Sequence, residues 1–183
     1  MFTVVTGGSG SGKSEFSENY LLRLDEQTGG NRERFYIATM FPYDEESHRR
    51  IARHRAMRRD KGFQTLECYT GLKDLEIPER NGRKPAVLLE CMSNLAANEY
   101  YREEGAGPDC AGEIIEGIRR LRAQSAHLVV VTNEVFSDGI FYDRSVEDYI
   151  RVLGQINRQM AALCDTFAEV VYTIPVCHKG ELI

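Results

Sequence analysis

The 183-residue chain lacks any apolar run long enough to cross a bilayer. Its apolar runs, such as residues 126–131 and 86–89, stop far short of the ~20 residues that a membrane-spanning helix needs. The segment from Met1 to Gly7 has no basic region and no long apolar core, so it does not resemble a signal peptide. With 42% hydrophobic and 28% charged residues, the composition is that of a globular protein and excludes a disordered chain.

The sequence also lacks an excess of positive charge and any pattern of paired cysteines. A net charge of −5 argues against a protein that binds nucleic acid through its phosphate backbone. The five cysteines are scattered, without a C-x-x-C pair, which argues against a disulfide framework or a structural zinc site. We therefore expect reduced thiols in a cytoplasmic protein, most of them buried as small apolar residues.

Short apolar runs alternate with helical patterns along the whole chain. The patterns predict strands at residues 2–6, 35–39, 86–89, 127–132 and 169–174. They predict helices at residues 13–24, 44–59, 93–101, 110–124 and 146–167, the second of them basic and capped by Asp44. This alternation predicts a three-layer α/β fold, a mostly parallel sheet with helices on both faces, as a single domain over residues 1–183.

The clearest motif is GGSGSGKS at residues 7–14, which matches the phosphate-binding loop G-x-x-x-x-G-K-[ST]. It stands between an apolar strand and an amphipathic helix, as such a loop must. Glycines let successive N–H groups point at phosphate oxygens, and the start of the helix adds its positive dipole. Lys13 is predicted to reach the β- and γ-phosphates, and Ser14 to offer its hydroxyl to Mg²⁺. The predicted loop residues are Gly7, Gly8, Ser9, Gly10, Ser11, Gly12, Lys13 and Ser14.

A phosphate-binding loop of this kind is expected to work with an acidic side chain at the end of a neighbouring strand, which holds the metal. Glu90 directly follows the predicted strand at 86–89, and Glu134 follows the one at 127–132. A carboxylate at such a position is costly unless it is paired or bound to metal. The sequence leaves both candidates open.

The segment at residues 47–61 is strongly basic, with six arginines between positions 49 and 59. It reads either as a solvated helix face or as a clamp for a polyphosphate, because guanidinium groups match phosphate geometry. His54 lies in the middle and is either a surface residue or a catalytic one. The surrounding arginines disfavour the imidazolium, and a neutral imidazole can attack a phosphorus atom.

These motifs occur together with several other short segments. They are TGGSGSGKS at 6–14, YIAT at 36–39, RIARHR at 50–55, LLEC at 88–91 and VTNEV at 131–135. In this order, they make the chain resemble the bifunctional adenosylcobinamide kinase / adenosylcobinamide-phosphate guanylyltransferase family of corrinoid biosynthesis. The resemblance covers nearly the whole chain and implies a RecA-like P-loop fold.

The resemblance implies two reactions. ATP or GTP phosphorylates adenosylcobinamide, and GMP is then transferred from GTP to adenosylcobinamide phosphate through a GMP–histidine intermediate, giving adenosylcobinamide-GDP and pyrophosphate. His54 matches the histidine of that intermediate. Lys13 is the second predicted catalytic residue, which would stabilise charge on the transferred γ-phosphoryl group in the kinase step. A homo-oligomer, a trimer in many members, is also implied.

The resemblance further implies which residues bind nucleotide and Mg²⁺. Mg²⁺ would lie on Ser14 and Glu90. Beyond the P-loop, the nucleotide-binding positions would be Ala38, Thr39, Met40, Arg55, Ala56, Met57, Arg58, Glu67 and Glu90. Glu67 is separated from His54 by one residue more than the family pattern has.

Two alternatives fit the same motifs. One is a kinase for a small molecule that uses only the P-loop. The other is a non-catalytic module that binds a nucleoside triphosphate and docks an acidic partner on its arginine-rich helix.

Overall fold

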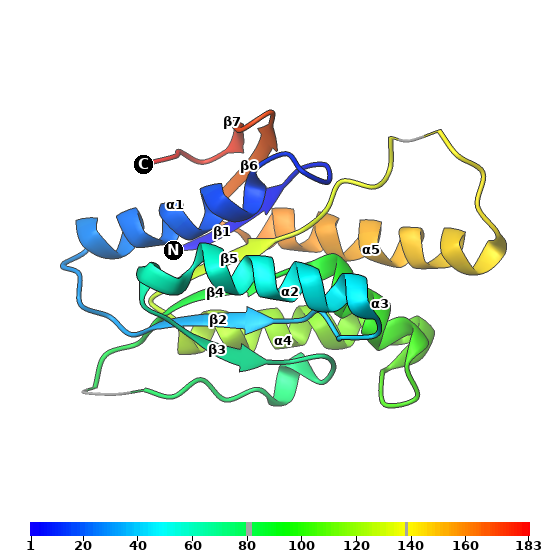
Figure 1. Ribbon diagram of the computed structural model, residues 1–183, viewed down its shortest axis with the longest axis horizontal. Coiled ribbons are helices and arrows are strands. Elements are labelled where there is room, and N and C mark those ends of the chain that lie inside the picture. The colour runs from blue at the N-terminus through cyan, green and yellow to red at the C-terminus, as the bar shows by residue number, and fades with distance from the viewer. Residues whose placement is uncertain (80–81, 138) are drawn as a thin grey trace.

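The computed structural model describes residues 1–79, 82–137 and 139–183. The described residues form one seven-stranded sheet in the order β3-β2-β4-β5-β1-β6-β7 (Figure 1). Neighbouring strands run parallel, except that β6 and β7 are antiparallel. The strands are β1 (Phe2–Thr6), β2 (Arg34–Ala38), β3 (Phe63–Glu67), β4 (Ala86–Glu90), β5 (His127–Val131), β6 (Thr166–Val171) and β7 (Ile174–Lys179).

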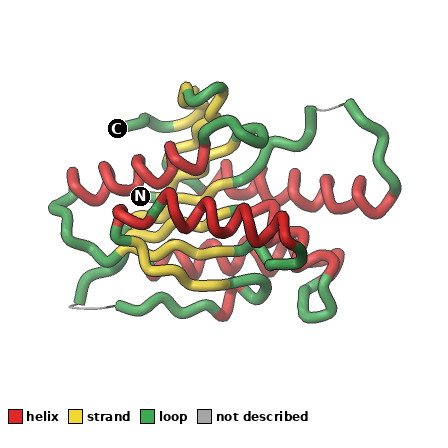
Figure 2. Tube along the Cα trace, in the orientation of Figure 1, coloured by secondary structure: helices red, strands yellow, loops and turns green. Residues whose placement is uncertain are grey.

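Helices cover both faces of this sheet. They are α1 (Lys13–Gln27), α2 (Glu45–Met57), α3 (Met92–Tyr101), α4 (Cys110–Gln124) and α5 (Arg144–Leu163). Short 3₁₀ turns lie at Arg59–Lys61, Leu72–Asp74 and Gly107–Asp109. Helices α1 and α2 lie on one side, and α4 and α5 on the other (Figures 1 and 2). The predicted three-layer α/β fold with a mostly parallel sheet is confirmed.

The central strands are buried because both of their faces are covered. Every residue of β4 and β5 is buried. Side chains alternate between two apolar clusters, so that Leu89 and Val130 pack toward α3, α4 and α5, whereas Leu88 and Val129 pack toward α1. This arrangement fixes the carboxyl ends of the parallel strands along one edge of the sheet.

The sequence reading was wrong at the edges of the sheet. It missed β3, whose five residues are all partly or fully exposed and carry no continuous apolar run. It extended the last helix to residue 167, whereas α5 ends at Leu163 and β6 begins at Thr166.

The single strand predicted at 169–174 is in fact the middle of a hairpin. Its turn is made by Tyr172 and Thr173, which have φ angles of 47° and 68°. Positive φ is uncommon for these residue types, and glycine and asparagine are the usual markers of such a turn. The residue types at this position therefore did not indicate a turn.

Two smaller expectations are confirmed. The Asp44 side chain accepts a hydrogen bond from the Ser47 backbone N–H at 2.7 Å and caps α2. Four of the five cysteines are buried free thiols, and the fifth, Cys177, is exposed. Among the described residues, no helix is long and apolar enough to cross a membrane.

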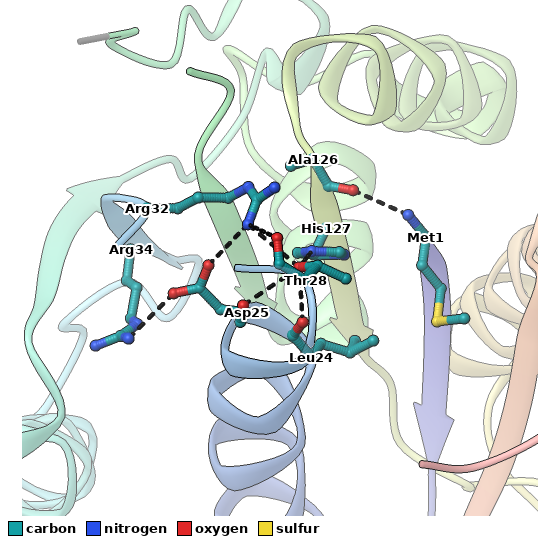
Figure 3. Close-up of polar contacts among 8 residues, drawn as sticks. All are labelled: Met1, Leu24, Asp25, Thr28, Arg32, Arg34, Ala126 and His127. Carbon is teal, nitrogen blue, oxygen red and sulfur yellow. Dashed lines mark hydrogen bonds and ion pairs between the residues drawn. The ribbon is translucent and has the colours of Figure 1, made fainter. Parts of the chain in front are cut away.

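A polar cluster closes the carboxyl end of α1, at the opposite end of the sheet from the P-loop (Figure 3). The fully buried Asp25 pairs with both Arg32 and Arg34 at 3.1 Å. The Thr28 hydroxyl donates to the backbone carbonyl of Leu24 at 2.8 Å and lies 2.7 Å from Nε2 of His127. These contacts tie the end of α1 to the first residue of β5.

Burial lowers the pKa of His127 from 6.5 to about 4, helped by the positive charges of the Met1 amino group and Arg32 and opposed by Asp25. The neutral ring is therefore the form that the folded protein favours. In the unfolded chain the ring takes up a proton already near pH 6.5.

We expect this difference to make the fold sensitive to acid. The contribution of His127 to stability is complete above pH 6.5 and is lost as the pH falls toward 4, because the unfolded chain then binds more protons. Between pH 7 and 4, the free energy of unfolding should fall by up to about 3 kcal/mol more in the wild type than in His127→Gln. Urea unfolding at several pH values measures this; parallel pH profiles for the two proteins would contradict the assignment.

Candidate active site

The P-loop follows β1 directly and leads into α1. Gly10 and Gly12 have φ angles of 75° and 91°, in the region that favours glycine, and Gly12 caps the start of α1. The Lys13 side chain folds back over the loop, where its ammonium donates to the Gly8 carbonyl at 2.9 Å. The loop thus presents backbone N–H groups, a helix N-terminus and a cation to one space.

The β6–β7 hairpin braces this loop from behind. The Thr173 backbone N–H donates to the Ser11 carbonyl at 2.8 Å. A Cβ atom on Gly12 would stand 2.9 Å from the Thr173 methyl carbon, and one on Gly7 would stand 2.6 Å from the Val170 carbonyl oxygen. The glycines at these two positions are required by close packing as well as by φ.

Of the two acidic candidates, Glu90 faces the P-loop. It ends β4, is 8% exposed, and accepts a hydrogen bond from the Ser14 hydroxyl. The Glu134 carboxylate instead accepts hydrogen bonds from the Phe136 N–H at 2.8 Å and the Ser137 hydroxyl at 3.1 Å, within its own loop. Of the two strand-end acids, position therefore favours Glu90 as the one that works with the P-loop.

The oxygens of Ser14 and Glu90 are a donor set suited to Mg²⁺, which prefers hard oxygen ligands together with nucleotide phosphates and water. The second carboxyl oxygen of Glu90 is buried and has no hydrogen-bond partner among the described residues. Burial raises the pKa of Glu90, while the Ser14 hydrogen bond and the Lys13 charge lower it. A cation at this point would satisfy the buried carboxylate.

His54 approaches the same carboxyl group from α2. Its Nδ1 lies 3.7 Å from the Glu90 carboxyl oxygen, longer than a hydrogen bond, and its side chain is 24% exposed. Helix α2 begins at the Asp44 cap and has no buried residue. Its inner side lines the same cavity as the carboxyl ends of β2, β3 and β4.

The pKa of His54 is lowered, so its imidazole is neutral near pH 7. Burial is the largest cause, Glu18 opposes it, and the positive charges of Arg58, Arg50 and Arg53 add to the lowering. The lowered pKa agrees with the prediction from the sequence. That prediction attributed the shift to the arginines, whereas burial contributes more.

A second layer of contacts holds α2 near the sheet. Lys61 donates to the fully buried Glu18 at 2.7 Å. The Arg58 guanidinium stacks 3.8 Å from the centre of the Tyr36 ring and donates to the Thr65 hydroxyl at 3.2 Å. Because Arg58 and Lys61 follow α2 in the chain, these contacts limit how far His54 can move from the sheet.

Together these elements enclose a cavity of about 550 Å³, which we call the nucleotide cavity. It is bounded by the P-loop, the carboxyl ends of β2, β3 and β4, and the inner side of α2. The predicted site residues that line it are Ser9, Gly10, Ser11, Gly12, Lys13, Ser14, Ala38, Met40, His54, Arg55, Met57, Arg58, Glu67 and Glu90. At its rim Arg55 and Glu67 form an exposed ion pair at 3.3 Å.

Four predicted positions do not line the cavity. Gly7 and Gly8 lie at the base of the loop, where their carbonyls accept hydrogen bonds from the Glu134 N–H and from Lys13. The Thr39 hydroxyl donates to the Cys91 carbonyl and accepts from the Cys91 N–H, both at 2.8 Å, so its side chain joins β2 to the end of β4. Ala56 is exposed.

The cavity also includes residues that the sequence reading did not assign to nucleotide binding. They are Glu15, Tyr36, Glu46, Arg50, Ile51, Arg53, Tyr69, Cys91, Asn94 and Asn133. Asn94 and Asn133 could have been predicted from the sequence, because both are polar residues that shortly follow a buried strand. Arg50 and Arg53 belong to the predicted phosphate clamp.

Replacing Gly12 by alanine should weaken nucleotide binding at least about tenfold, because the Cβ would require strained backbone and meet Thr173. Gly112→Ala is the control, since Gly112 lies exposed in α4 with nothing within 4 Å of an added Cβ. Calorimetric titration with Mg·GTP measures the effect. Equal affinity in both variants would show that the loop does not need its observed shape.

The neutral state of His54 is directly measurable. In the nucleotide-free protein, the ring C–H signal that is absent from His54→Ala should titrate by NMR with a midpoint below 6.5, the ordinary value. A midpoint at or above 6.5 would mean that the ring is not shielded from water as described.

Comparisons with known proteins agree with this geometry. A solved structure of an ATPase domain matches with a TM-score of 0.50 over 92% of this chain and 68% of that chain, at 9% identity. At that identity the likeness concerns the fold alone, a P-loop ATPase fold of the RecA-like type.

Sequence relatives extend over nearly the whole chain. The bifunctional adenosylcobalamin biosynthesis protein CobU of Escherichia coli (strain K12) is 30% identical over 190 residues, covering 98% of this chain and 100% of that protein. The protein of the same name from Salmonella typhimurium is 30% identical over 98% of this chain and 100% of its own length. The bifunctional protein CobP of Pseudomonas aeruginosa is 28% identical over 99% of both.

The family model for cobinamide kinase / cobinamide phosphate guanyltransferase matches residues 3–177. The chain therefore belongs to the cobinamide kinase / cobinamide phosphate guanyltransferase family.

Proposed function

We propose that this protein phosphorylates adenosylcobinamide with ATP or GTP and then transfers GMP from GTP to adenosylcobinamide phosphate. The observation that carries the proposal is that Lys13, Glu90 and His54 line one cavity. A kinase that uses only the P-loop does not require a half-buried neutral imidazole beside that loop, whereas a guanylyltransferase that works through a histidine does. The membership in the family and the names of the relatives support both activities.

In the kinase step, the P-loop holds the triphosphate through its backbone N–H groups. The substrate hydroxyl attacks the γ-phosphorus, the bond to the β-phosphate oxygen breaks, and Lys13 stabilises the negative charge that develops. Ser14 and Glu90 would hold Mg²⁺, which would neutralise further phosphate charge.

In the transfer step, a neutral His54 nitrogen attacks the α-phosphorus of GTP and pyrophosphate leaves. Nδ1 faces Glu90, so the other ring nitrogen, Nε2, is the one free to attack. The phosphate of adenosylcobinamide phosphate then displaces the histidine and takes the GMP. The covalent intermediate divides one difficult transfer into two easier ones.

The arginines of α2 act in the transfer step, and the P-loop acts in both steps. Arg50, Arg53 and Arg55 line the cavity on the same helix as His54. Their guanidinium groups suit the β- and γ-phosphates that become the leaving pyrophosphate. In this scheme the P-loop holds the triphosphate in the first step and the pyrophosphate portion in the second.

The homo-oligomer that the resemblance implies has structural support at one edge of the sheet. All six residues of β7 are exposed, and Ile174, Val176 and the preceding Tyr172 are 65%, 44% and 89% exposed. Exposed apolar side chains on an edge strand are typical of a surface that another copy covers.

The free cysteines support a reducing compartment, in keeping with the expected cytoplasmic location.

Incubation with GTP labelled in the α-phosphate and Mg²⁺, without any corrinoid, should label the protein. The label should be stable in base and labile in acid, and mass spectrometry should find the GMP adduct on His54. His54→Ala should lose the label and keep the phosphorylation of adenosylcobinamide. His48→Ala is a matched control, because His48 is exposed on the same helix outside the cavity and should label normally.

The outcomes separate the alternative functions. An unlabelled wild type that phosphorylates adenosylcobinamide would be a single-activity kinase, and one that binds GTP without either reaction would be a non-catalytic module. Lys13→Ala should lose both reactions. If it lost phosphorylation alone and still took up GMP, the P-loop would not serve both steps.

A further inference from the structure

A second cavity, of about 500 Å³, adjoins the nucleotide cavity. Met40, Glu46, Arg50 and Asn94 line both of them, so the two spaces share a wall and meet along it. The second cavity lies between the segment at 40–44, which joins β2 to α2, and the helix α3. Apart from Met40 and Arg50, which also line the nucleotide cavity, its residues have no role in the two reactions derived above.

Aromatic rings form one side of this second cavity. Phe41 and Tyr43 line it, with ring centres 4.7 Å apart, and Tyr43 is 65% exposed. Phe41 also lies 5.0 Å from the ring of Tyr69, which lines the nucleotide cavity, and the Arg102 guanidinium stacks 4.0 Å above it. The aromatic wall thus runs from one cavity to the other.

The opposite side is α3, which presents small and amide side chains. Asn94, Ala97 and Asn98 line the cavity there. The Asn98 amide nitrogen donates to the Thr39 carbonyl at 2.8 Å, which fixes the amide in place. The Asn98 amide oxygen accepts from the Tyr43 hydroxyl at 3.4 Å, so Asn94 is the amide on this wall without a side-chain hydrogen bond to the described residues. Flat aromatic faces beside an amide favour a ligand that is broad, apolar in its ring and rich in amides.

The chemistry of the proposed function sets where the second substrate must bind. Its hydroxyl has to reach the γ-phosphorus in the first step, and the phosphate so formed has to reach the α-phosphorus in the second. A space that shares Arg50 and Asn94 with the nucleotide cavity is placed to meet both demands. A cobinamide is a corrin macrocycle carrying amide side chains, which matches the walls of that space.

We propose that the second cavity binds the corrinoid substrate, with the aminopropanol arm and the adjoining ring edge held between the 40–44 segment and α3. The remainder of the macrocycle lies at the mouth, because about 500 Å³ suits a drug-sized part of the ligand rather than all of it. The arm points past Asn94 toward the nucleotide. After phosphorylation, Arg50 meets the new phosphate and keeps it beside the nucleotide for the second step.

This assignment rests on the proposed function, and two variants test it. Ala97→Phe puts a ring into the second cavity alone, because Ala97 does not line the nucleotide cavity. Tyr43→Ala removes an exposed ring without disturbing the core. Phe141→Ala is the matched control, an aromatic residue that is 98% exposed and lines neither cavity.

Calorimetric titration with adenosylcobinamide, and GMP labelling of His54 in the same preparations, measure the two cavities separately. We expect the dissociation constant for adenosylcobinamide to rise at least about tenfold in Ala97→Phe and severalfold in Tyr43→Ala. Labelling by GTP should stay within about twofold of the wild type in both variants. Phe141→Ala should match the wild type in binding and labelling.

Wild-type affinity for adenosylcobinamide in Ala97→Phe and Tyr43→Ala, with labelling intact, would overturn the assignment of the corrinoid to this cavity and leave the proposed function standing. A wild-type protein that takes up GMP label yet binds no adenosylcobinamide would overturn the assignment as well. A wild-type protein that neither binds adenosylcobinamide nor takes up the label would instead be a failure of the proposed function itself.

Discussion

One buried carboxyl group, that of Glu90, connects the three parts of the candidate active site. It accepts a hydrogen bond from Ser14 at the start of α1, and it lies 3.7 Å from His54 on α2. The charge of Lys13 acts on it as well. A carboxylate buried to this extent is unfavourable without partners of opposite charge or hydrogen-bond donors. The demand for such partners suits this point of the site to a cation.

The fold supplies this carboxyl group through the order of its strands. Because β4 lies between β2 and β5 in a parallel sheet, its last residue reaches the same edge as the loop that follows β1. The segment after β2 leads from that edge into α2, so His54 and the arginines of α2 line the same cavity as the P-loop. The same segment borders the second cavity, against α3. Position in the sheet, more than any single contact, thus explains why the two cavities adjoin.

The sequence was sufficient to predict the features that depend on local rules. The P-loop, the buried strands β4 and β5, and the cap at Asp44 each follow from residue types within a short window. Residue types do not separate Glu90 from Glu134, because both follow buried strands. Only the structure distinguishes them, since the Glu134 carboxylate accepts hydrogen bonds within its own loop.

The remaining misses have tertiary causes. Strand β3 is a short edge strand without an apolar run, and the turn at Tyr172 and Thr173 uses residues that seldom adopt positive φ. The Thr39 hydroxyl ties β2 to Cys91, a contact that the sequence did not indicate. The pairing of Phe41 with Tyr43 beside α3 depends on how the chain crosses the sheet, and no local pattern indicates it.

The central claim is that the imidazole of His54 and the P-loop act on the same bound triphosphate. A crystal structure of the protein with Mg²⁺ and a GTP analogue carrying a methylene group between the α- and β-phosphorus atoms tests it most directly. The account predicts that the β- and γ-phosphates lie on the P-loop and that Nε2 of His54 stands about 3–3.5 Å from the α-phosphorus, opposite the bridging carbon. Phosphates bound elsewhere, or a histidine turned away from the α-phosphorus in every subunit, would contradict it.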